Sequence, residues 1–252
     1  MKKVLGVIPA RYADSHLPGK VLKKIGDKTI VEWVYESARR CPAIDQVVVA
    51  TDDERVLEEI KKIKADNIMT LETHRTGTDR LVEVADYYSS FDTIVNIQGN
   101  MPGIAPSIIS GVIELKKNRP EFDVTTAARP FKSHEDPQMP NQVKVVFSKS
   151  GRALYFSRSL VPFPRNAEEQ PVYLHLGVYA YSRDFLLHYS TLPPSGLERT
   201  EMLEQLRILE NDYQIGLHLT NSFGMGIDTD ADLALIKNHY QQHKGFYQEN
   251  NG

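Results

Sequence analysis

The chain has 252 residues, of which 41% are hydrophobic and 25% charged, and its formal net charge at pH 7 is −3. This composition is typical of a soluble globular protein, and the low net charge gives no reason to expect a nucleic acid or a membrane surface as a partner. No apolar run is long enough for membrane insertion. Cys41 is the only cysteine, which excludes an internal disulfide and fits a reducing, cytoplasmic setting.

Strands and helices alternate in the first half of the chain. The apolar run at residues 3–9 predicts a strand buried on both faces; a secretory signal is disfavoured because the run is short and Arg11 follows it. The apolar spacing predicts strands at 46–53, 67–70 and 93–99 and helices at 29–40, 54–64, 77–88 and 107–118. Short connections between such elements indicate a mostly parallel, Rossmann-like α/β sheet flanked by helices.

The second half is richer in short β-branched and aromatic runs, which predict strands at 123–131, 142–148, 152–159, 173–182 and 214–220. These strands are expected to be antiparallel additions to the sheet or an antiparallel β arm. Helices are expected at 198–210 and 230–244. No repeat, low-complexity tract or linker interrupts the pattern, so a single domain over 1–252 is expected.

A loop with two cations follows the first strand. It carries Arg11 and Lys20, with Gly19 keeping the backbone small beside the lysine. In open α/β sheets, ligands bind beyond the carboxyl ends of the strands, where this loop lies. The two cations and free backbone N–H groups suit a triphosphate, although the loop is not a Walker motif and an ordinary surface turn is the alternative.

Polar residues also follow the next two strands. Asp52 and Asp53 can hold a ribose, a base amine or a metal, or can cap the following helix, which is the favoured role for Asp53. Gly77, Thr78 and Arg80 form a loop that can read the edge of a base. The alternative for this loop is an ordinary helix N-terminus.

In the second half, Arg158 lies in an apolar and aromatic run, where it either snorkels to the surface or awaits an anion such as a sugar carboxylate. His175, Gly177, Tyr179 and Tyr181 alternate along a strand and therefore share one face. That face can line a sugar pocket or simply pack in the core.

Acidic residues occupy two later helices. Glu204 and Gln205 are adjacent on one predicted helix, where a solvated face is the simplest interpretation. Asp228 precedes the last helix and can ligate Mg²⁺. Alternatively, Asp228, Asp230 and Asp232 together complement the helix dipole.

Taken in chain order, these stretches resemble the 3-deoxy-manno-octulosonate cytidylyltransferase family. The matching segments are IPARY, LPGK, VVVATDD, H-R-TGTDR, VNIQG, ALYFSRS, P-VYLHLGVYAY, LE-EMLEQLR and G-IDT. They extend from residue 7 to about residue 235, which is nearly the whole chain. The succession ALYFSRS, HLGVYAY and LEQLR is the most specific part of the resemblance.

The resemblance implies a nucleotide-diphospho-sugar transferase type of fold and a Mg²⁺-dependent enzyme of lipopolysaccharide synthesis. Such an enzyme transfers CMP from CTP to the C2 hydroxyl of 3-deoxy-manno-octulosonate (Kdo) or a close 2-keto-3-deoxy sugar acid and releases pyrophosphate. It also implies a homodimer, a nucleotide-binding half at 1–120, a sugar-binding and dimerisation half at 121–225, and a closing helix and tail at 226–252.

The resemblance further assigns residues to roles. The nucleotide set is Arg11, Lys20, Asp52, Gly77, Thr78 and Arg80. The sugar-acid set is Gln98, Arg158, His175, Tyr179, Glu204 and Gln205, with Arg158 meeting the carboxylate. Asp228 is the expected Mg²⁺ ligand, and Arg11, Lys20 and Asp228 are the expected catalytic residues.

Two positions depart from the family pattern. His16 stands where the family has an arginine before LPGK, and Asn100-Met101 stands where the family reads Asp and, commonly, Glu after Gln-Gly. That Asp is the family's second Mg²⁺ ligand, and Asn supplies only a neutral oxygen. One charge pair of this kind is worth roughly 4 kcal/mol at about 4 Å and an effective dielectric near 20, before desolvation offsets it. The alternatives to an active enzyme are therefore a weakened or inactive paralogue that binds nucleotide or sugar acid in a regulatory role, or a transferase with altered sugar specificity.

Overall fold

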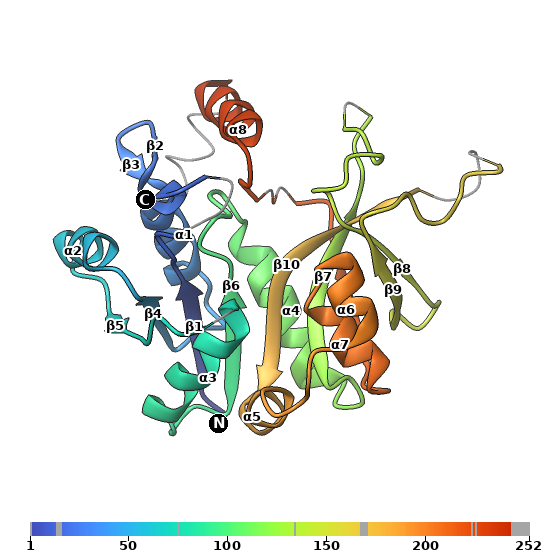
Figure 1. Ribbon diagram of the computed structural model, residues 1–252, viewed down its shortest axis with the longest axis horizontal. Coiled ribbons are helices and arrows are strands. Elements are labelled where there is room, and N and C mark those ends of the chain that lie inside the picture. The colour runs from blue at the N-terminus through green and yellow to red at the C-terminus, as the bar shows by residue number, and fades with distance from the viewer. Residues whose placement is uncertain are drawn as a thin grey trace.

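A computed structural model describes residues 2–13, 17–74, 76–133, 135–166, 171–222, 224 and 226–242 of the chain. In this part of the chain, a nine-stranded sheet runs through the centre with helices on both faces (Figure 1). The strands of this sheet are β1 (Val4–Pro9), β4 (Gln46–Thr51), β5 (Asn67–Met69), β6 (Thr93–Ile97), β7 (Val124–Pro130), β8 (Lys144–Phe147), β9 (Ala153–Ser157), β10 (Tyr173–Ser182) and β11 (Ile215–Leu219). A separate hairpin consists of β2 (Lys24–Ile25) and β3 (Lys28–Thr29).

The main strands lie in the order β11-β7-β10-β6-β1-β4-β5. All neighbours pair in parallel except β10, which is antiparallel to both β6 and β7. Strands β8 and β9 pair antiparallel with each other, and Lys144 of β8 lies opposite Leu174 of β10. The predicted mostly parallel sheet with an antiparallel arm is confirmed.

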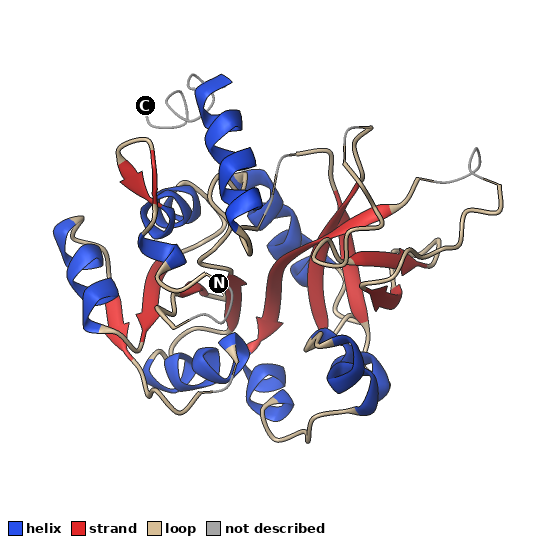
Figure 2. Cartoon of the chain, turned by 45° about the horizontal axis from the view of Figure 1, so that its top comes forward, coloured by secondary structure: helices blue, strands red, loops and turns tan. Residues whose placement is uncertain are grey.

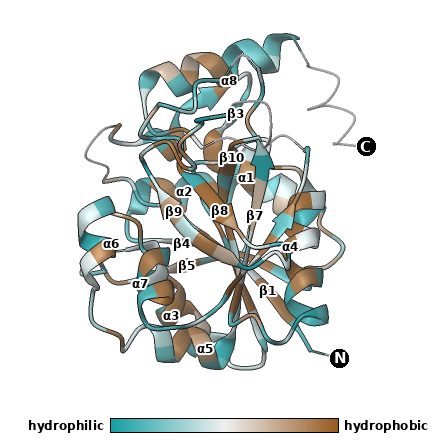
Figure 3. Cartoon of the chain, turned by 90° about the vertical axis from the view of Figure 1, so that its right-hand side faces the viewer, coloured by the Kyte–Doolittle hydropathy of each residue, from teal (hydrophilic) through white to brown (hydrophobic). Residues whose placement is uncertain are grey.

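Helices cover the two faces of the sheet (Figure 2). They are α1 (Ile30–Arg39), α2 (Glu54–Lys62), α3 (Gly77–Tyr87), α4 (Pro106–Asn118), α5 (Arg183–Tyr189), α6 (Gly196–Glu201), α7 (Gln205–Glu210), α8 (Asp230–Gln242) and a 3₁₀ turn η1 (Lys20–Leu22). Apolar side chains of α1, α2 and α4 share one core cluster with the sheet, and those of α3, α5 and α7 share another. Figure 3 shows hydrophobic residues along the central strands and hydrophilic ones on outward helix surfaces. No helix in the described part combines the length and the apolarity needed to cross a membrane.

The expected single helix at 198–210 is wrong. Helix α6 ends at Glu201, the next residue, Met202, has a left-handed φ of 53°, and α7 begins at Gln205. The break turns the chain so that Leu203 is buried while Glu204 faces the cleft described below. Helical periodicity alone does not reveal such a break, because Met carries no signal for the left-handed conformation.

Candidate active site

A cleft of about 580 Å³ lies beside β6 and β10, and a second hollow of about 410 Å³ adjoins it at the carboxyl end of β1. Gln98 and Asn100 line both hollows and therefore mark the place where they meet. The smaller hollow contains Arg11 and Lys20. The expected triphosphate loop thus lies at the carboxyl end of a parallel strand, as the sequence predicted.

Close backbone packing brings the β1 and β6 loops together. A Cβ atom on Gly99 would lie 2.6 Å from the carbonyl oxygen of Pro9, so only glycine fits this approach. Gly19 has a φ of 67° and its N–H donates to the carbonyl oxygen of Tyr12 at 2.8 Å, which places Lys20 at the start of η1. Two glycines therefore determine how the loop that carries Arg11 and Lys20 packs beside the β6 loop.

Asp228 is the meeting point of three chain segments. Its Oδ1 accepts from Lys20 Nζ at 3.1 Å and from Asn100 Nδ2 at 2.9 Å. The backbone N–H of Ile227 also donates to the carbonyl oxygen of Asn100 at 2.8 Å. Asp232, which is buried, caps α8 by accepting from the backbone N–H of Asp228 at 3.1 Å and from Thr229. The three aspartates therefore differ in role: Asp232 caps the helix, Asp228 contacts Lys20 and Asn100, and Asp230 pairs with Lys23 at 3.3 Å.

The donor set at this point fits Mg²⁺. Mg²⁺ is commonly held by one or two carboxylates together with substrate phosphates, rather than by a cage made only of protein groups. Asp228 supplies one carboxylate with about half of its side chain exposed, and rotation of the Asn100 amide would offer a neutral oxygen beside it. A cluster of three or more His, Cys, Asp or Glu side chains that could hold a metal ion is absent from the described residues. His16 lies outside the described residues.

Asp52 and Arg80 pair with each other. Arg80 is fully buried, and its guanidinium donates to Asp52 Oδ2 at 2.5 Å and to the Thr70 hydroxyl. Asp53 instead caps α2 by accepting from the backbone N–H of Arg55 at 2.9 Å, and hydrogen bonds from the Arg55 side chain lower the pKa of Asp53. The favoured capping role of Asp53 is confirmed, whereas Asp52 and Arg80 line neither of the two hollows.

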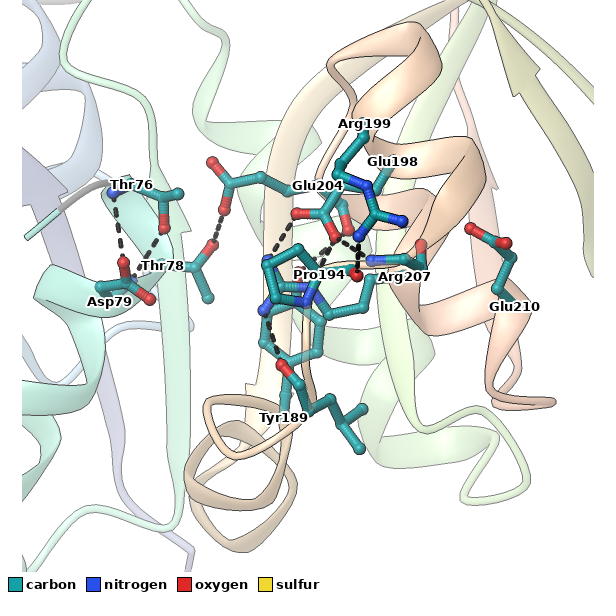
Figure 4. A network of polar contacts seen from close by, with 12 residues as sticks. Thr76, Thr78, Asp79, Tyr189, Pro194, Glu198, Arg199, Glu204, Arg207 and Glu210 are labelled. Carbon is teal, nitrogen blue, oxygen red and sulfur yellow. Dashed lines mark hydrogen bonds and ion pairs between the residues drawn. The ribbon is translucent and has the colours of Figure 1, made fainter.

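The first turn of α3 joins the two halves of the site (Figure 4). Thr76 and Asp79 form a capping box, so an ordinary helix N-terminus is present at this loop. The next hydroxyl is used differently, because Thr78 Oγ1 donates to Glu204 Oε2 at 2.7 Å. Burial raises the pKa of Glu204, while the threonine hydroxyls oppose that rise. Thr78, which was expected to bind the nucleotide, therefore contacts Glu204, which was expected to bind the sugar acid.

A row of rings on β10 lines the larger cleft. His175 lies 5.4 Å from Tyr179, which lies 6.0 Å from Tyr181, measured between ring centroids. Burial lowers the pKa of His175 to about 3, so the imidazole is neutral. His175 Nε2 lies 3.1 Å from the Thr126 hydroxyl, which itself donates to the carbonyl oxygen of Val178 at 2.7 Å. The ring therefore donates through Nε2 and keeps Nδ1 as an acceptor.

Arg158 binds backbone oxygens in this structure. Its guanidinium donates to the carbonyl oxygens of Glu201 at 2.7 Å, Pro140 at 3.0 Å and Met202 at 3.3 Å. Since these acceptors are neutral, the positive charge of Arg158 stays uncompensated by them, and an incoming carboxylate at the cleft would find a cation. Gln205 is buried at the start of α7 and also lines the cleft.

Sequence reasoning missed three further residues around this cleft. Asn96 is 2% exposed, lines the cleft and has no hydrogen-bond partner for its Oδ1. Arg129 is fully buried and pairs with Glu135 at 2.5 Å. Lys144 is buried, and its ammonium donates to the carbonyl oxygens of Met139 at 3.0 Å and Arg158. A local signal was available for Asn96, which interrupts the mostly apolar strand β6, whereas Arg129 lies in a strand of mixed polarity and Lys144 begins β8.

Comparisons with known proteins agree with this geometry. Residues 5–215 match a family model described as cytidylyltransferase. A 3-deoxy-manno-octulosonate cytidylyltransferase from Leptospira interrogans is 48% identical over 97% of this chain and 98% of its own length, and one from Fusobacterium nucleatum is 40% identical over 95% and 98%. A solved structure of CMP:2-keto-3-deoxy-manno-octonic acid synthetase complexed with CTP has a TM-score of 0.88 at 39% identity, covering 96% of this chain and 99% of that one. The inositol-1-phosphate CTP transferase from T. maritima shares the fold alone, with a TM-score of 0.67 at 12% identity over 93% of each chain.

Proposed function

This chain belongs to the 3-deoxy-manno-octulosonate cytidylyltransferase family, and on that premise we propose that it transfers CMP from CTP to the C2 hydroxyl of Kdo and releases pyrophosphate. The observation that carries the proposal is the pair of adjoining hollows. One contains the cations Arg11 and Lys20, the other contains the rings and carboxyl groups of the second half, and they meet at Gln98 and Asn100. A hydroxyl from one hollow would thus face a phosphate from the other.

In the hollow proposed for the nucleotide, the chain's own residues would position the nucleotide and neutralise the charge of its phosphates. Arg11 and Lys20 would offset the charge of the triphosphate, and the Asp52–Arg80 pair would serve the cytidine beside the Gly77–Thr78 backbone. Asp228 and Asn100 would hold Mg²⁺ against the phosphates. Mg²⁺ bound there would spread the developing charge and lower the pKa of the attacking hydroxyl.

On the sugar side, the cleft offers one cation and several neutral groups. Arg158 would receive the sugar carboxylate, which would replace backbone carbonyls as its partner. His175, neutral because its pKa is about 3, would accept a hydrogen bond from a sugar hydroxyl through Nδ1. Tyr179, Glu204 and Gln205 complete the wall of the cleft. None of these groups needs to act as a strong base.

One observation favours a second candidate, a paralogue that binds nucleotide or sugar acid without efficient turnover. Asn100 contributes an amide that donates to Asp228 where a second carboxylate would strengthen metal binding. Each ~1.4 kcal/mol lost from transition-state stabilisation is a tenfold loss of rate, so even a modest weakening of the metal site would be visible.

The test is pyrophosphate release from CTP and Kdo in the presence of Mg²⁺. The proposal expects release by the natural protein and more release per enzyme by the Asn100→Asp variant at low Mg²⁺. No release from the natural protein, with recovery in the variant, would establish the paralogue instead. Calorimetric titration of CTP and of Kdo then shows which ligand a non-catalytic protein still binds. Replacing Kdo with other 2-keto-3-deoxy sugar acids in the same assay identifies altered sugar specificity.

We further propose that the enzyme acts in the cytoplasm, where CTP is available. There it would catalyse a step of lipopolysaccharide synthesis. Cys41 is buried and reduced, which fits that compartment. Fractionation of the producing cell, followed by detection of the protein in the cytoplasmic extract, checks the location.

A further inference from the structure

A small apolar cluster joins residues 17–33 to residues 227–240, next to the loop that carries Lys20. Its members come from the segment before α1, from α1 itself and from the region of α8: Leu17, Ile25, Ile30, Trp33, Ile227, Leu233 and Ile236, with Tyr240 packed against them. The cluster is separate from the two clusters that flank the sheet. In Figure 1, α8 stands at the top of the molecule, away from the sheet and close to the β2–β3 hairpin. Helix α8 is thus attached through this cluster.

Tyr240 packs directly on the turn of the hairpin. Gly26 has a φ of 67°, and a Cβ atom there would lie only 2.7 Å from Cζ and Oη of Tyr240. The Tyr240 ring also lies 5.6 Å from the ring of Trp33, whose Nε1 donates to the carbonyl oxygen of Ile25 at 2.9 Å. Glycine, tyrosine and tryptophan therefore form one close contact between the hairpin and the far end of α8.

The opposite end of α8 carries Asp228. Ile227 is fully buried in the same cluster, and the Thr229–Asp232 cap connects Asp228 rigidly to the helix. Between Asp230 and Tyr240 the helix rises about 15 Å, so Tyr240 is too far away to touch a group bound at Asp228. The exposed Lys23–Asp230 ion pair adds little to this attachment.

We propose that Tyr240 is a positioning residue: by packing α8 on the glycine turn at Gly26, it fixes the Asp228 carboxylate against Lys20 and Asn100. The inference rests on the proposed role of Asp228 at the Mg²⁺–triphosphate site. Loosening the far end of the helix lets α8 tilt about Ile227, which moves the carboxylate away from the place where phosphate and metal meet. Tyr240 thereby acts on metal binding through Asp228 and touches no substrate.

The test uses the Tyr240→Ala variant of the full chain and has a readout besides activity. Trp33 is the only tryptophan of the chain and is buried against α8, so its fluorescence and its quenching by acrylamide report whether the helix is packed. We expect Trp33 to become more accessible in the variant. CTP binding is measured by calorimetry at a series of Mg²⁺ concentrations. The Mg²⁺ concentration that gives half of the maximal CTP binding should rise about tenfold, which is the lower end of the range for losing a group that supports a metal ligand. Kdo binding should stay unchanged.

Matched variants separate positioning from a general loss of structure. Leu235 lies on the exposed side of the same helix, so Leu235→Ala should change neither readout. Tyr240→Phe keeps the ring, so its Trp33 accessibility and its half-saturating Mg²⁺ concentration should be close to those of the natural protein. Gly26→Ala drives a Cβ into the same ring, so its effect and that of Tyr240→Ala should not add in the double variant.

Each result decides between the possibilities. The proposal is overturned if Tyr240→Ala leaves Trp33 protected, or if the helix loosens while the half-saturating Mg²⁺ concentration stays unchanged. It is also overturned if Tyr240→Ala raises that concentration equally in an Asp228→Asn background, because the effect would then bypass Asp228. A natural protein that binds no CTP with Mg²⁺ overturns the proposed function as well, whereas normal binding in both proteins overturns only this inference.

Discussion

Asp228 collects two hydrogen-bond donors, the ammonium of Lys20 and the amide of Asn100, on one carboxylate oxygen. A lysine charge and a neutral amide compensate a single carboxylate well when no divalent cation is bound. A pair of carboxylates in the same place would repel each other until a cation arrived. At the residue scale, we therefore expect Asn100 to stabilise the proposed Mg²⁺ site when no metal is bound.

Replacing Asn100 with Asp should invert that balance. Without Mg²⁺, the variant should melt at a lower temperature than the natural protein, because two carboxylates then share one lysine. With Mg²⁺ in hundredfold excess over its Kd, binding adds about 2.7 kcal/mol to the free energy of unfolding. Calorimetric melting with and without Mg²⁺ measures both effects, and Asn100→Ala controls for loss of the amide. Equal Mg²⁺ responses in the natural and Asp proteins would contradict this account of the site.

His175 should make the protein acid-sensitive. Its pKa is about 3 in the folded protein and 6.5 in the unfolded chain, so below pH 6.5 the unfolded state binds a proton that the folded state refuses. Stability is therefore lost as pH falls from 6.5 towards 3, by about 2 kcal/mol at about pH 5. Urea unfolding at pH 6.5 and at about pH 5 should show a smaller loss of stability for His175→Gln than for the natural protein. The His188→Gln variant should keep the natural acid sensitivity; if His175→Gln keeps it as well, the buried imidazole is not its source.

At the scale of elements, the break between α6 and α7 matters most for the site. It directs Glu204 towards Thr78 and presents the carbonyl oxygens of Glu201 and Met202 to Arg158. A bidentate ion pair holds the two short helices together: Arg207 donates to Glu198 at 2.7 and 2.5 Å, and both residues are buried (Figure 4). Neither helix is long enough to be stable alone, so the pair and the packing maintain the geometry.

Removing one partner of this pair should destabilise the protein strongly. In Glu198→Ala, the guanidinium of Arg207 remains buried without its carboxylate, which typically costs about 3–5 kcal/mol. Urea unfolding should show that loss, and Kdo binding should weaken because the α6–α7 junction moves. The double variant Glu198→Met with Arg207→Leu removes both charges and should recover much of the stability. If Glu198→Ala unfolds like the natural protein, the pair does not hold these helices.

The same elements show where sequence reasoning succeeded and where it stopped. Strands such as β1 and β10 and helices such as α2 were predicted because their apolar periodicity is a local property. The turn at Met202 was not, since it depends on Leu203 packing below it and on Arg207 reaching Glu198, which are tertiary contacts. The helix α5 and the β2–β3 hairpin were not predicted, because both are too short to show a periodic apolar pattern.

For the whole molecule, the prediction of the site depended on chain topology. Arg11, Gly77 and Gln98 follow parallel strands whose carboxyl ends meet at one edge of the sheet, so their convergence could be foreseen. The residues of the second half lie on other elements, and they were expected in the site only because of the family resemblance. Two contacts could not be foreseen, namely those of Asp52 with Arg80 and of Thr78 with Glu204. Each contact joins segments that are distant in the chain, and no local sequence pattern shows that such segments lie close together in space. Asn96 did carry a local signal, a polar residue within the mostly apolar strand β6, but that its oxygen is left without a partner depends on the neighbouring β10.

The antiparallel arm leads to a last prediction, that the chain is a homodimer. Leu154 on β9 is 51% exposed, and Phe163, in the segment that follows β9, is 83% exposed, so two large apolar side chains of this region are in contact with solvent. Burying such side chains against a second copy would remove this apolar surface from water in both chains at once. Light scattering after size exclusion should give twice 28.6 kDa. Leu154→Asp should shift the mass towards one chain, whereas Leu235→Asp, on exposed α8, should not. A natural protein that elutes with the mass of one chain at micromolar concentration would rule the dimer out.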